Sequence, residues 1–244
     1  MRRWIATVSL LVASLVLFQT TVAAADAPQK TSSPKKAPMT QPTSINASTN
    51  LAAALPAVPP TPQPAPGLET IYLAGGCFWG MEEILRKIPG VRETQSGYTG
   101  GWLPNPKYDD THDSKSGHAE SVKVVFDPKT LSLEELLEKW FFRMHDPTTL
   151  NRQGNDVGTQ YRSGIYTSSP EQQAVAQALI AEMATSGVYR QPIVTEVLPL
   201  ANYWPAEDYH QDFFARNPGQ GYCMAVAAPK VAKFRKTFAR LARG

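Results

Sequence analysis

The sequence is poor in the residues that bind metal ions and in those that cross-link a fold. Among 244 residues it has two cysteines, Cys77 and Cys223, and four histidines. It has no Cys-x-x-Cys motif and no pair of histidines at helical spacing, so it offers little support for a zinc site. We expect neither a metal ion nor any other cofactor. Two cysteines allow a single intramolecular disulfide.

Residues 26–66 lack aromatic residues altogether and, after Asp26, acidic residues as well. They consist mainly of Pro, Ala, Ser and Thr. Such a stretch cannot bury enough apolar surface to offset the chain entropy lost on folding. The composition therefore predicts a disordered spacer over residues 26–66.

Residues 1–25, ahead of the spacer, have the three parts of a secretory signal peptide. Arg2 and Arg3 precede an apolar run over residues 4–18, and small residues follow at 22–25. The run is shorter than the roughly 20 residues that a membrane-spanning helix needs. The leader predicts export to the periplasm or cell envelope. The alternative is an uncleaved leader that anchors the chain, the only membrane contact that we expect.

The charge of the remaining residues, 67–244, gives no basic face. Five of the 24 Lys and Arg residues and one of the 21 Asp and Glu residues precede residue 67. The rest of the chain carries 19 basic and 20 acidic residues, a formal charge of −1. Nucleic-acid binding needs a basic surface on the domain itself, so we do not expect it. We predict one catalytic domain over residues 67–244.

The hydrophobic pattern of this domain predicts strands and helices in alternation. Residues 119–126 alternate, with Glu120 on the same face as three apolar side chains, and Ser132 and Ser169 begin helices. The order is strand, helix, strand, strand, helix, strand, helix, strand, over residues 71–73, 77–88, 91–96, 119–126, 132–144, 162–167, 169–186 and 193–198.

This order contains the ferredoxin-like split βαβ unit, so the predicted fold is an α+β sandwich. An irregular C-terminal segment should follow, with short helical pieces around residues 207–214. The basic stretch 230–243 has apolar residues interleaved, which indicates a surface helix.

Cys77 follows Gly75 and Gly76 and stands where the first predicted helix begins. Unpaired N–H groups at a helix N-terminus favour the thiolate, which is the nucleophilic form of cysteine. Adjacent glycines would let another molecule approach the backbone. The pattern predicts a reactive thiol, and the alternative is a buried thiol that only packs.

Glu120 and Cys223 are the groups that could act with this thiol. A carboxyl group on an apolar strand face loses hydration, which raises its pKa and makes it a candidate general acid. The alternative is an exposed glutamate at the start of the strand. Cys223 lies in a Gly- and Pro-rich stretch that we expect to be mobile, as suits a disulfide that forms and breaks. A permanent disulfide is the default for an exported chain and stays open.

The motif Gly76-Cys77-Phe78-Trp79-Gly80 resembles the signature of the A-type peptide methionine sulfoxide reductases, which are specific for the S epimer. Further matching motifs follow in order at residues 97–101, 104–108, 117–120, 145–148, 154–161 and 206–211. The resemblance spans about residues 70–232 and leaves out the leader and the spacer.

The resemblance implies a role for each matching residue in the reduction of methionine-S-sulfoxide. Cys77 would attack the sulfoxide sulfur, and Glu120 would protonate the departing oxygen. Tyr108 and Tyr161 would hydrogen-bond that oxygen, with Asp156 supporting the site.

Substrate binding and regeneration are implied in the same way. Phe78 and Trp79 would hold the S-methyl group, with His210 near the pocket. Cys223 would attack oxidised Cys77 to form a disulfide, which a thioredoxin-like protein would reduce. Substrates would be free and protein-bound methionine sulfoxide, and the enzyme would be a monomer.

Two other functions stay open on the residues alone. One is a cysteine hydrolase in which His118 or His210 serves as the base for Cys77. The other is a binding module in which Cys77 and Cys223 form a structural disulfide.

Overall fold

A computed structural model of the protein describes residues 63–112 and 115–241. The predicted signal peptide, and the predicted spacer up to residue 62, lie outside the described residues. Within the described ranges, no helix combines the length and the apolar character needed to cross a membrane.

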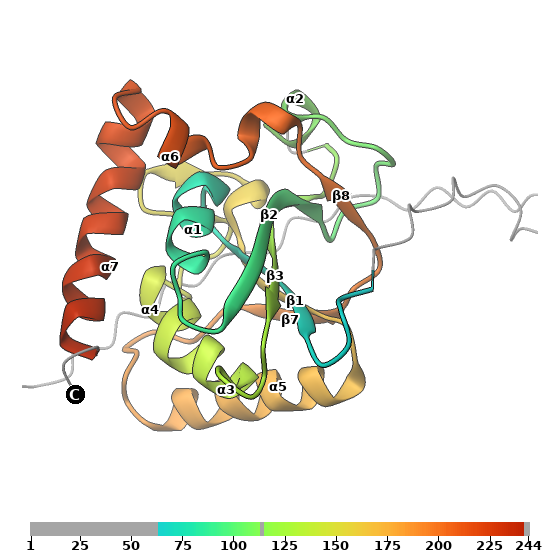
Figure 1. Ribbon diagram of the computed structural model, residues 1–244, viewed down its shortest axis with the longest axis vertical. Coiled ribbons are helices and arrows are strands. Elements are labelled where there is room, and N and C mark those ends of the chain that lie inside the picture. Colours follow the sequence, from blue (N-terminus) through green and yellow to red (C-terminus); the bar gives the residue numbers. More distant parts are fainter. Residues whose placement is uncertain (1–62, 113–114, 242–244) are drawn as a thin grey trace, which may run out of the picture. The chain divides into compact units, whose positions relative to one another are not determined.

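The fold is built on a six-stranded sheet in the order β7-β6-β1-β3-β2-β8 (Figure 1). Its four central strands are β1 (Glu69–Gly75), β2 (Val91–Thr99), β3 (Ala119–Phe126) and β6 (Ser163–Thr167). The order β6-β1-β3-β2, with antiparallel neighbours, is that of the split βαβ unit, which confirms the predicted fold class. The edge strands are β7 (Glu196–Pro199), parallel to β6, and β8 (Tyr203–Pro205), antiparallel to β2.

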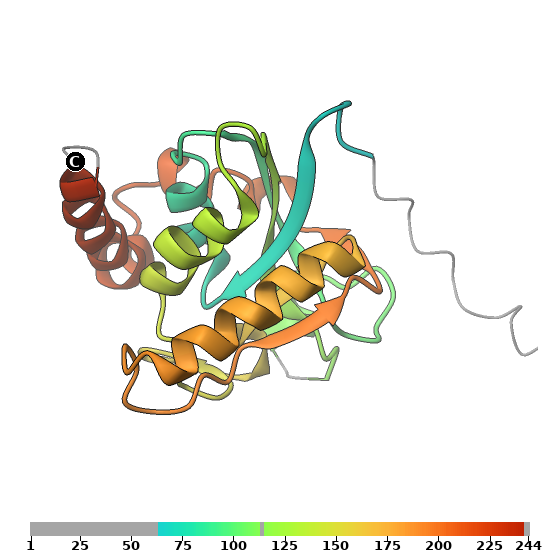
Figure 2. The same cartoon turned by 90° about the horizontal axis from the view of Figure 1, so that it is seen from below.

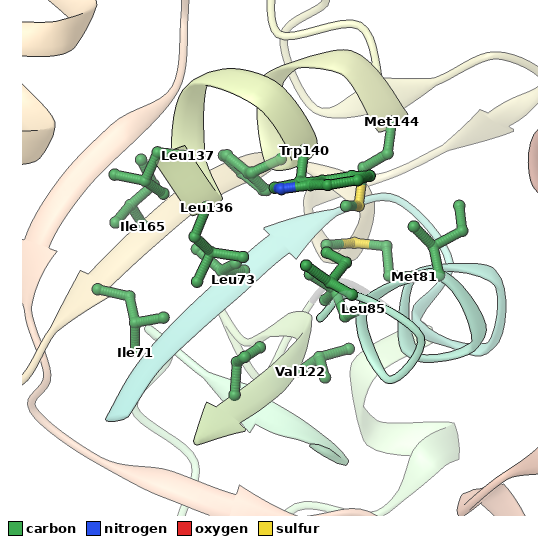
Figure 3. Packing of buried hydrophobic residues seen from close by; sticks show 14 of the residues in the cluster. Ile71, Leu73, Met81, Leu85, Val122, Leu136, Leu137, Trp140, Met144 and Ile165 are labelled. Carbon is green, nitrogen blue, oxygen red and sulfur yellow. The ribbon is translucent and has the colours of Figure 1, made fainter. Parts of the chain in front are cut away.

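Helices cover one face of the sheet and enclose the main core with it (Figures 1 and 2). They are α1 (Phe78–Leu85), the continuous segment α3 (Leu133–Glu135), η2 (Leu136–Phe141) and α4 (Phe142–Met144), and α5 (Pro170–Thr185). Figure 3 shows Leu73 of β1 near the centre of this core, with Ile71 of the same strand, Val122 of β3, Met81 and Leu85 of α1 and Trp140 of η2 around it. Each such side chain contributes about 1.5–3 kcal/mol when it is fully buried.

The predicted helix starts are confirmed by their caps. The Ser132 hydroxyl accepts from the Glu135 N–H at 3.1 Å, and the Ser169 hydroxyl accepts from the Gln172 N–H at 3.2 Å. The turns that follow Glu135 widen into the π-helix η2, yet Leu136, Leu137 and Trp140 still point into the core. Apolar spacing thus predicted the buried face although it could not predict the wider turn.

Several short elements lie in stretches that were predicted as loops. They are α2 (Tyr108–His112), the hairpin of β4 (Arg152–Gln153) and β5 (Asp156–Val157), η3 (Thr159–Tyr161) and the edge strand β8. Each has five residues or fewer, so no hydrophobic period can develop along it. Tyr98, beyond the end of the strand predicted over residues 91–96, belongs to β2 and is fully buried.

The C-terminal segment is irregular at first and then helical. It contains η4 (Asp208–His210), α6 (Phe213–Arg216), η5 (Cys223–Ala227) and α7 (Ala228–Leu241). The predicted surface helix is confirmed as α7, which lies beside α1 (Figure 1) and buries Val231 and Phe234. The expectation that Cys223 lies in a mobile stretch is wrong, because Cys223 opens η5 and its side chain is fully buried.

Candidate active site

Gly75 and Gly76 join β1 to Cys77. Gly76 has a φ of +92°, and a Cβ there would lie 2.6 Å from Cγ of Gln153. A Cβ on Gly75 would meet the His145 ring at 3.0 Å. The two glycines therefore make room for side chains of the same chain. This corrects the expectation that they admit another molecule.

Cys77 is the N-cap residue of α1, as predicted, but its thiol does not ionise easily. It is 9% exposed, and the loss of hydration together with the charge of Glu120 raises its pKa. The backbone N–H of Trp79 and the hydroxyl of Tyr222 hydrogen-bond the sulfur and oppose the rise. The predicted low pKa is wrong here, because desolvation outweighs the helix terminus.

Glu120 lies next to Cys77, across the start of α1. It is 1% exposed and shares the core face of β3 with Val122, Val124 and Phe126, as predicted. Its Oε2 accepts a 2.9 Å hydrogen bond from the backbone N–H of Phe78, the residue after Cys77. Burial raises its pKa to about 8, so the group carries a proton near neutral pH. The alternative of an exposed strand-end glutamate is excluded.

His112 is a site residue that the sequence did not predict. Its Nε2 lies 3.6 Å from Oε1 of Glu120 and 3.2 Å from the Tyr161 hydroxyl oxygen. Its Nδ1 lies 2.9 Å from the carbonyl oxygen of Tyr108, one helical turn earlier in α2. The i, i+4 spacing of Tyr108 and His112 was the available signal, hidden in a five-residue helix.

Aromatic rings pack around Trp79. Its indole N–H donates to Nδ1 of His210 at 3.0 Å, and burial lowers the pKa of His210 to about 4, so this imidazole is neutral. Phe213 stacks on Trp79 with ring centroids 3.9 Å apart, and Tyr222 meets its edge at 5.5 Å. His210 thus orients Trp79. The resemblance implied only that His210 lies near the pocket, and this hydrogen bond defines its contact there.

Phe78 and Trp79 differ in their surroundings. The Phe78 ring is fully buried between Trp79, Tyr98 and His210. Trp79 instead contacts Tyr108, with ring planes only 10° apart. The structure brings Trp79 among the site phenols and packs Phe78 behind it.

Three phenols stand around the thiol and the carboxyl group. Burial, and then the negative groups nearby, raise the pKa of Tyr108, Tyr161 and Tyr222, so each keeps its proton and can donate a hydrogen bond. The Tyr222 hydroxyl donates to Oδ2 of Asp156 at 2.9 Å. Asp156 thereby holds the residue that precedes Cys223.

Comparison with known proteins identifies the family of this arrangement. The family model "Peptide methionine sulfoxide reductase" matches residues 69–242. The chain belongs to this family.

Curated relatives agree with this result. A peptide methionine sulfoxide reductase MsrA of Polynucleobacter asymbioticus is 51% identical over 176 residues, which cover 72% of this chain and 92% of the relative. One of Deinococcus radiodurans is 48% identical over 176 residues, 72% of this chain and 85% of the relative. The A type that the motifs resembled is therefore confirmed, and this chain is a peptide-methionine (S)-S-oxide reductase.

Solved structures of the same family share the fold. Methionine sulfoxide reductase A of Corynebacterium diphtheriae is 44% identical with a TM-score of 0.60, covering 66% of this chain and 79% of that one. Reduced Mxr1 of Saccharomyces cerevisiae is 34% identical with a TM-score of 0.60, covering 64% and 90%.

In this methionine sulfoxide reductase the histidines proposed for a hydrolase are engaged elsewhere. Nδ1 of His118 accepts from the Gly101 N–H at 3.2 Å, and its Nε2 lies 2.8 Å from the Leu103 carbonyl oxygen. His210 is held by Trp79. In the described part of the chain, no hydrogen bond joins either ring to Cys77. Both cysteines are free thiols, so they do not form the structural disulfide of the binding-module alternative.

Lys230 of α7 is a second residue that the sequence did not predict. Its ammonium donates to the carbonyl oxygen of Gly75 at 2.9 Å. It lines a cavity of about 820 Å³ together with Cys77, His145 and Asp156. The sequence around Lys230 predicts a surface helix, and a lysine on such a helix is expected to be exposed to solvent.

Proposed function

We propose that Cys77 is the nucleophile and Glu120 the general acid in the reduction of methionine-S-sulfoxide. The observation that carries this assignment is the 2.9 Å bond between Glu120 and the N–H that follows Cys77. It holds a protonated carboxyl group beside the thiol, where a sulfoxide would present sulfur and oxygen together.

Protonation of Glu120 helps both groups in the first step. A neutral Glu120 can give its proton to the sulfoxide oxygen, and it no longer repels a thiolate at Cys77. The sulfur of Cys77 attacks the sulfoxide sulfur and then takes over its oxygen. The thiol becomes a sulfenic acid and the sulfoxide becomes a thioether, so two electrons pass from Cys77 to the substrate.

The remaining predicted residues surround this exchange. Tyr108 and Tyr161 remain protonated and supply donors for the sulfoxide oxygen, while Asp156 fixes Tyr222. Trp79, oriented by His210, supplies an apolar ring for the S-methyl group. Phe78 contributes by packing behind Trp79 and through its backbone N–H.

Regeneration uses the second thiol. Cys223 attacks the Cys77 sulfenic acid, which forms the disulfide and releases water. A thioredoxin-like dithiol then reduces the disulfide by exchange. Only Cys77 and Cys223 are present, so no second disulfide relay can follow. Because the leader predicts export, the reductant would be an envelope protein.

The test is turnover of the two methionine sulfoxide epimers by wild type, Cys77→Ser and Cys223→Ser. With dithiothreitol, wild type should reduce the S epimer only, and Cys77→Ser should lose more than about 1,000-fold in rate. Cys223→Ser should reduce one equivalent of sulfoxide and then fail with a thioredoxin-type reductant. Retained turnover by Cys77→Ser would refute the assignment.

A further inference from the structure

Lys230 brings a positive charge from the C-terminal helix to the catalytic thiol. Besides its 2.9 Å bond to the Gly75 carbonyl, its Nζ lies 3.7 Å from the position that a Cβ on Gly76 would occupy. Gly76 is the residue before Cys77. The ammonium group is thus fixed against the backbone turn that carries the thiol.

The charged groups that shift the pKa of Lys230 are all acidic. The negative charges of Cys77, of Asp156 from β5 and of Glu120 from β3 raise the pKa of the ammonium group. The neutral ring of His145 lines the same cavity. The other charged groups that line this cavity are Arg143, Asp146, Arg190 and Lys233. Burial lowers the pKa of Lys230 to about 8, and the negative groups oppose this shift.

We propose that Lys230 is a positioning residue of this reductase and that its ammonium, held by the Gly75 carbonyl, is the counter-ion of the Cys77 thiolate. The inference rests on the proposed role of Cys77. A buried thiol whose pKa is raised by desolvation and by a carboxylate needs a compensating charge to ionise. Trp79 and Tyr222 give the sulfur hydrogen bonds, and Lys230 gives it a full charge.

The position of Lys230 in the chain adds a consequence. It follows Cys223 by seven residues, along the continuous helical segment η5–α7. The segment packs against Gly80 of α1, where a Cβ would lie 3.6 Å from Cβ of Ala227 and 3.7 Å from Cδ of Lys230, at ordinary contact distance. The charge reaches Cys77 only while the segment that carries the resolving thiol is docked.

The test measures the ionisation of Cys77 directly, as the rate of iodoacetamide alkylation against pH. Cys223→Ser is the background, so that Cys77 is the only thiol. Lys230→Met should slow alkylation about tenfold at pH 7, where Lys230 carries its charge, which corresponds to an upward shift of about one unit in the apparent pKa of the thiol. Lys230→Arg, which keeps the charge, should restore the profile. Lys236→Met, on the same helix, is the matched control and should match the background.

Two results would overturn the inference. One is a Lys230→Met profile that coincides with the background while circular dichroism shows an intact fold. The other is equal slowing in Lys230→Arg and Lys230→Met, since a shape change would then be the cause. If Lys230→Met does not fold, Lys230→Gln takes its place and must show the same upward shift. Alkylation reports on the thiolate even if Cys77→Ser retains sulfoxide turnover, so the two proposals fail separately.

Discussion

Cys77 and Cys223 are both buried, free thiols, but the groups around them differ. Cys77 lines a cavity and is acted on by Glu120, Tyr222 and Lys230. At Cys223, loss of hydration alone raises the pKa. The backbone N–H of Cys223 donates to Oε1 of Gln220, and the thiol packs in the apolar core.

The difference fits the proposed roles of Cys77 as the attacking thiol and Cys223 as the resolving thiol. Burial raises the pKa of both thiols. The pKa of Cys77 depends in addition on the charges of its neighbours. Protonation of Glu120 removes a negative charge near Cys77, and docking of Lys230 adds a positive one. Both changes lower the pKa of the Cys77 thiol. Among the described residues, no charged group shifts the pKa of Cys223. The following predictions test this contrast.

The largest effect is expected when the acid beside Cys77 is removed. Glu120→Ala should lower kcat/KM by at least about 100-fold, because it removes a proton donor. Glu120→Gln still donates a hydrogen bond and should stay within about tenfold of wild type. Steady-state turnover of methionine-S-sulfoxide at pH 7 measures both. Equal losses would mean that Glu120 only fills space.

Stability should depend on pH through Glu120 as well. Its pKa is raised in the folded state, so between about pH 4.5 and pH 8 the folded chain holds a proton that the unfolded chain has released. This contribution to stability is present in acid and is lost as the pH rises through 8. At pH 8, Glu120→Gln should raise the free energy of unfolding by about 4 kcal/mol and leave it unchanged at pH 4.

Urea unfolding at the two pH values would measure this difference. The exposed Glu134→Gln is the control and should shift stability by less than about 0.5 kcal/mol at either pH. A pH-independent gain in Glu120→Gln would show that Glu120 is not protonated in the fold.

The smallest effect is expected at Tyr222, which lies next to Cys223 in the chain and whose hydroxyl, held by Asp156, lowers the pKa of Cys77. Tyr222→Phe removes about 1 kcal/mol of hydrogen bonding, so alkylation of Cys77 at pH 7 should slow about fivefold. In a Cys77→Ser background the alkylation of Cys223 should not change. If Cys223 responded more than Cys77, Tyr222 would serve the packing of η5 instead.

Most of the fold could be predicted from the sequence, because a long strand or helix repeats its hydrophobic period often enough to be recognised. The alternation in β3 predicted both the strand and the buried position of Glu120, and serine caps located two helices. The edge strand β8 was not predicted, because its three residues form a strand only by pairing with β2, which is distant in the sequence.

The site was predicted in its residues more than in its electrostatics. The residues next to Cys77 in the sequence predict a helix N-terminus and therefore a low pKa. Burial by segments that are distant in the sequence raises the pKa of this thiol instead. His112 and Lys230 escaped for the same reason. Their neighbours Glu120 and Gly75 become neighbours only when the sheet and the C-terminal helix are in place.

The two outer strands of the sheet share a feature with a consequence for association. β7 has four residues and β8 has three, and each ends in a proline, Pro199 and Pro205. Proline has no N–H to offer an incoming strand, and a short edge leaves few unpaired groups. Both borders of the sheet are therefore poor templates for strand addition by another chain, whether a second copy of this protein or an oxidised, partly unfolded substrate.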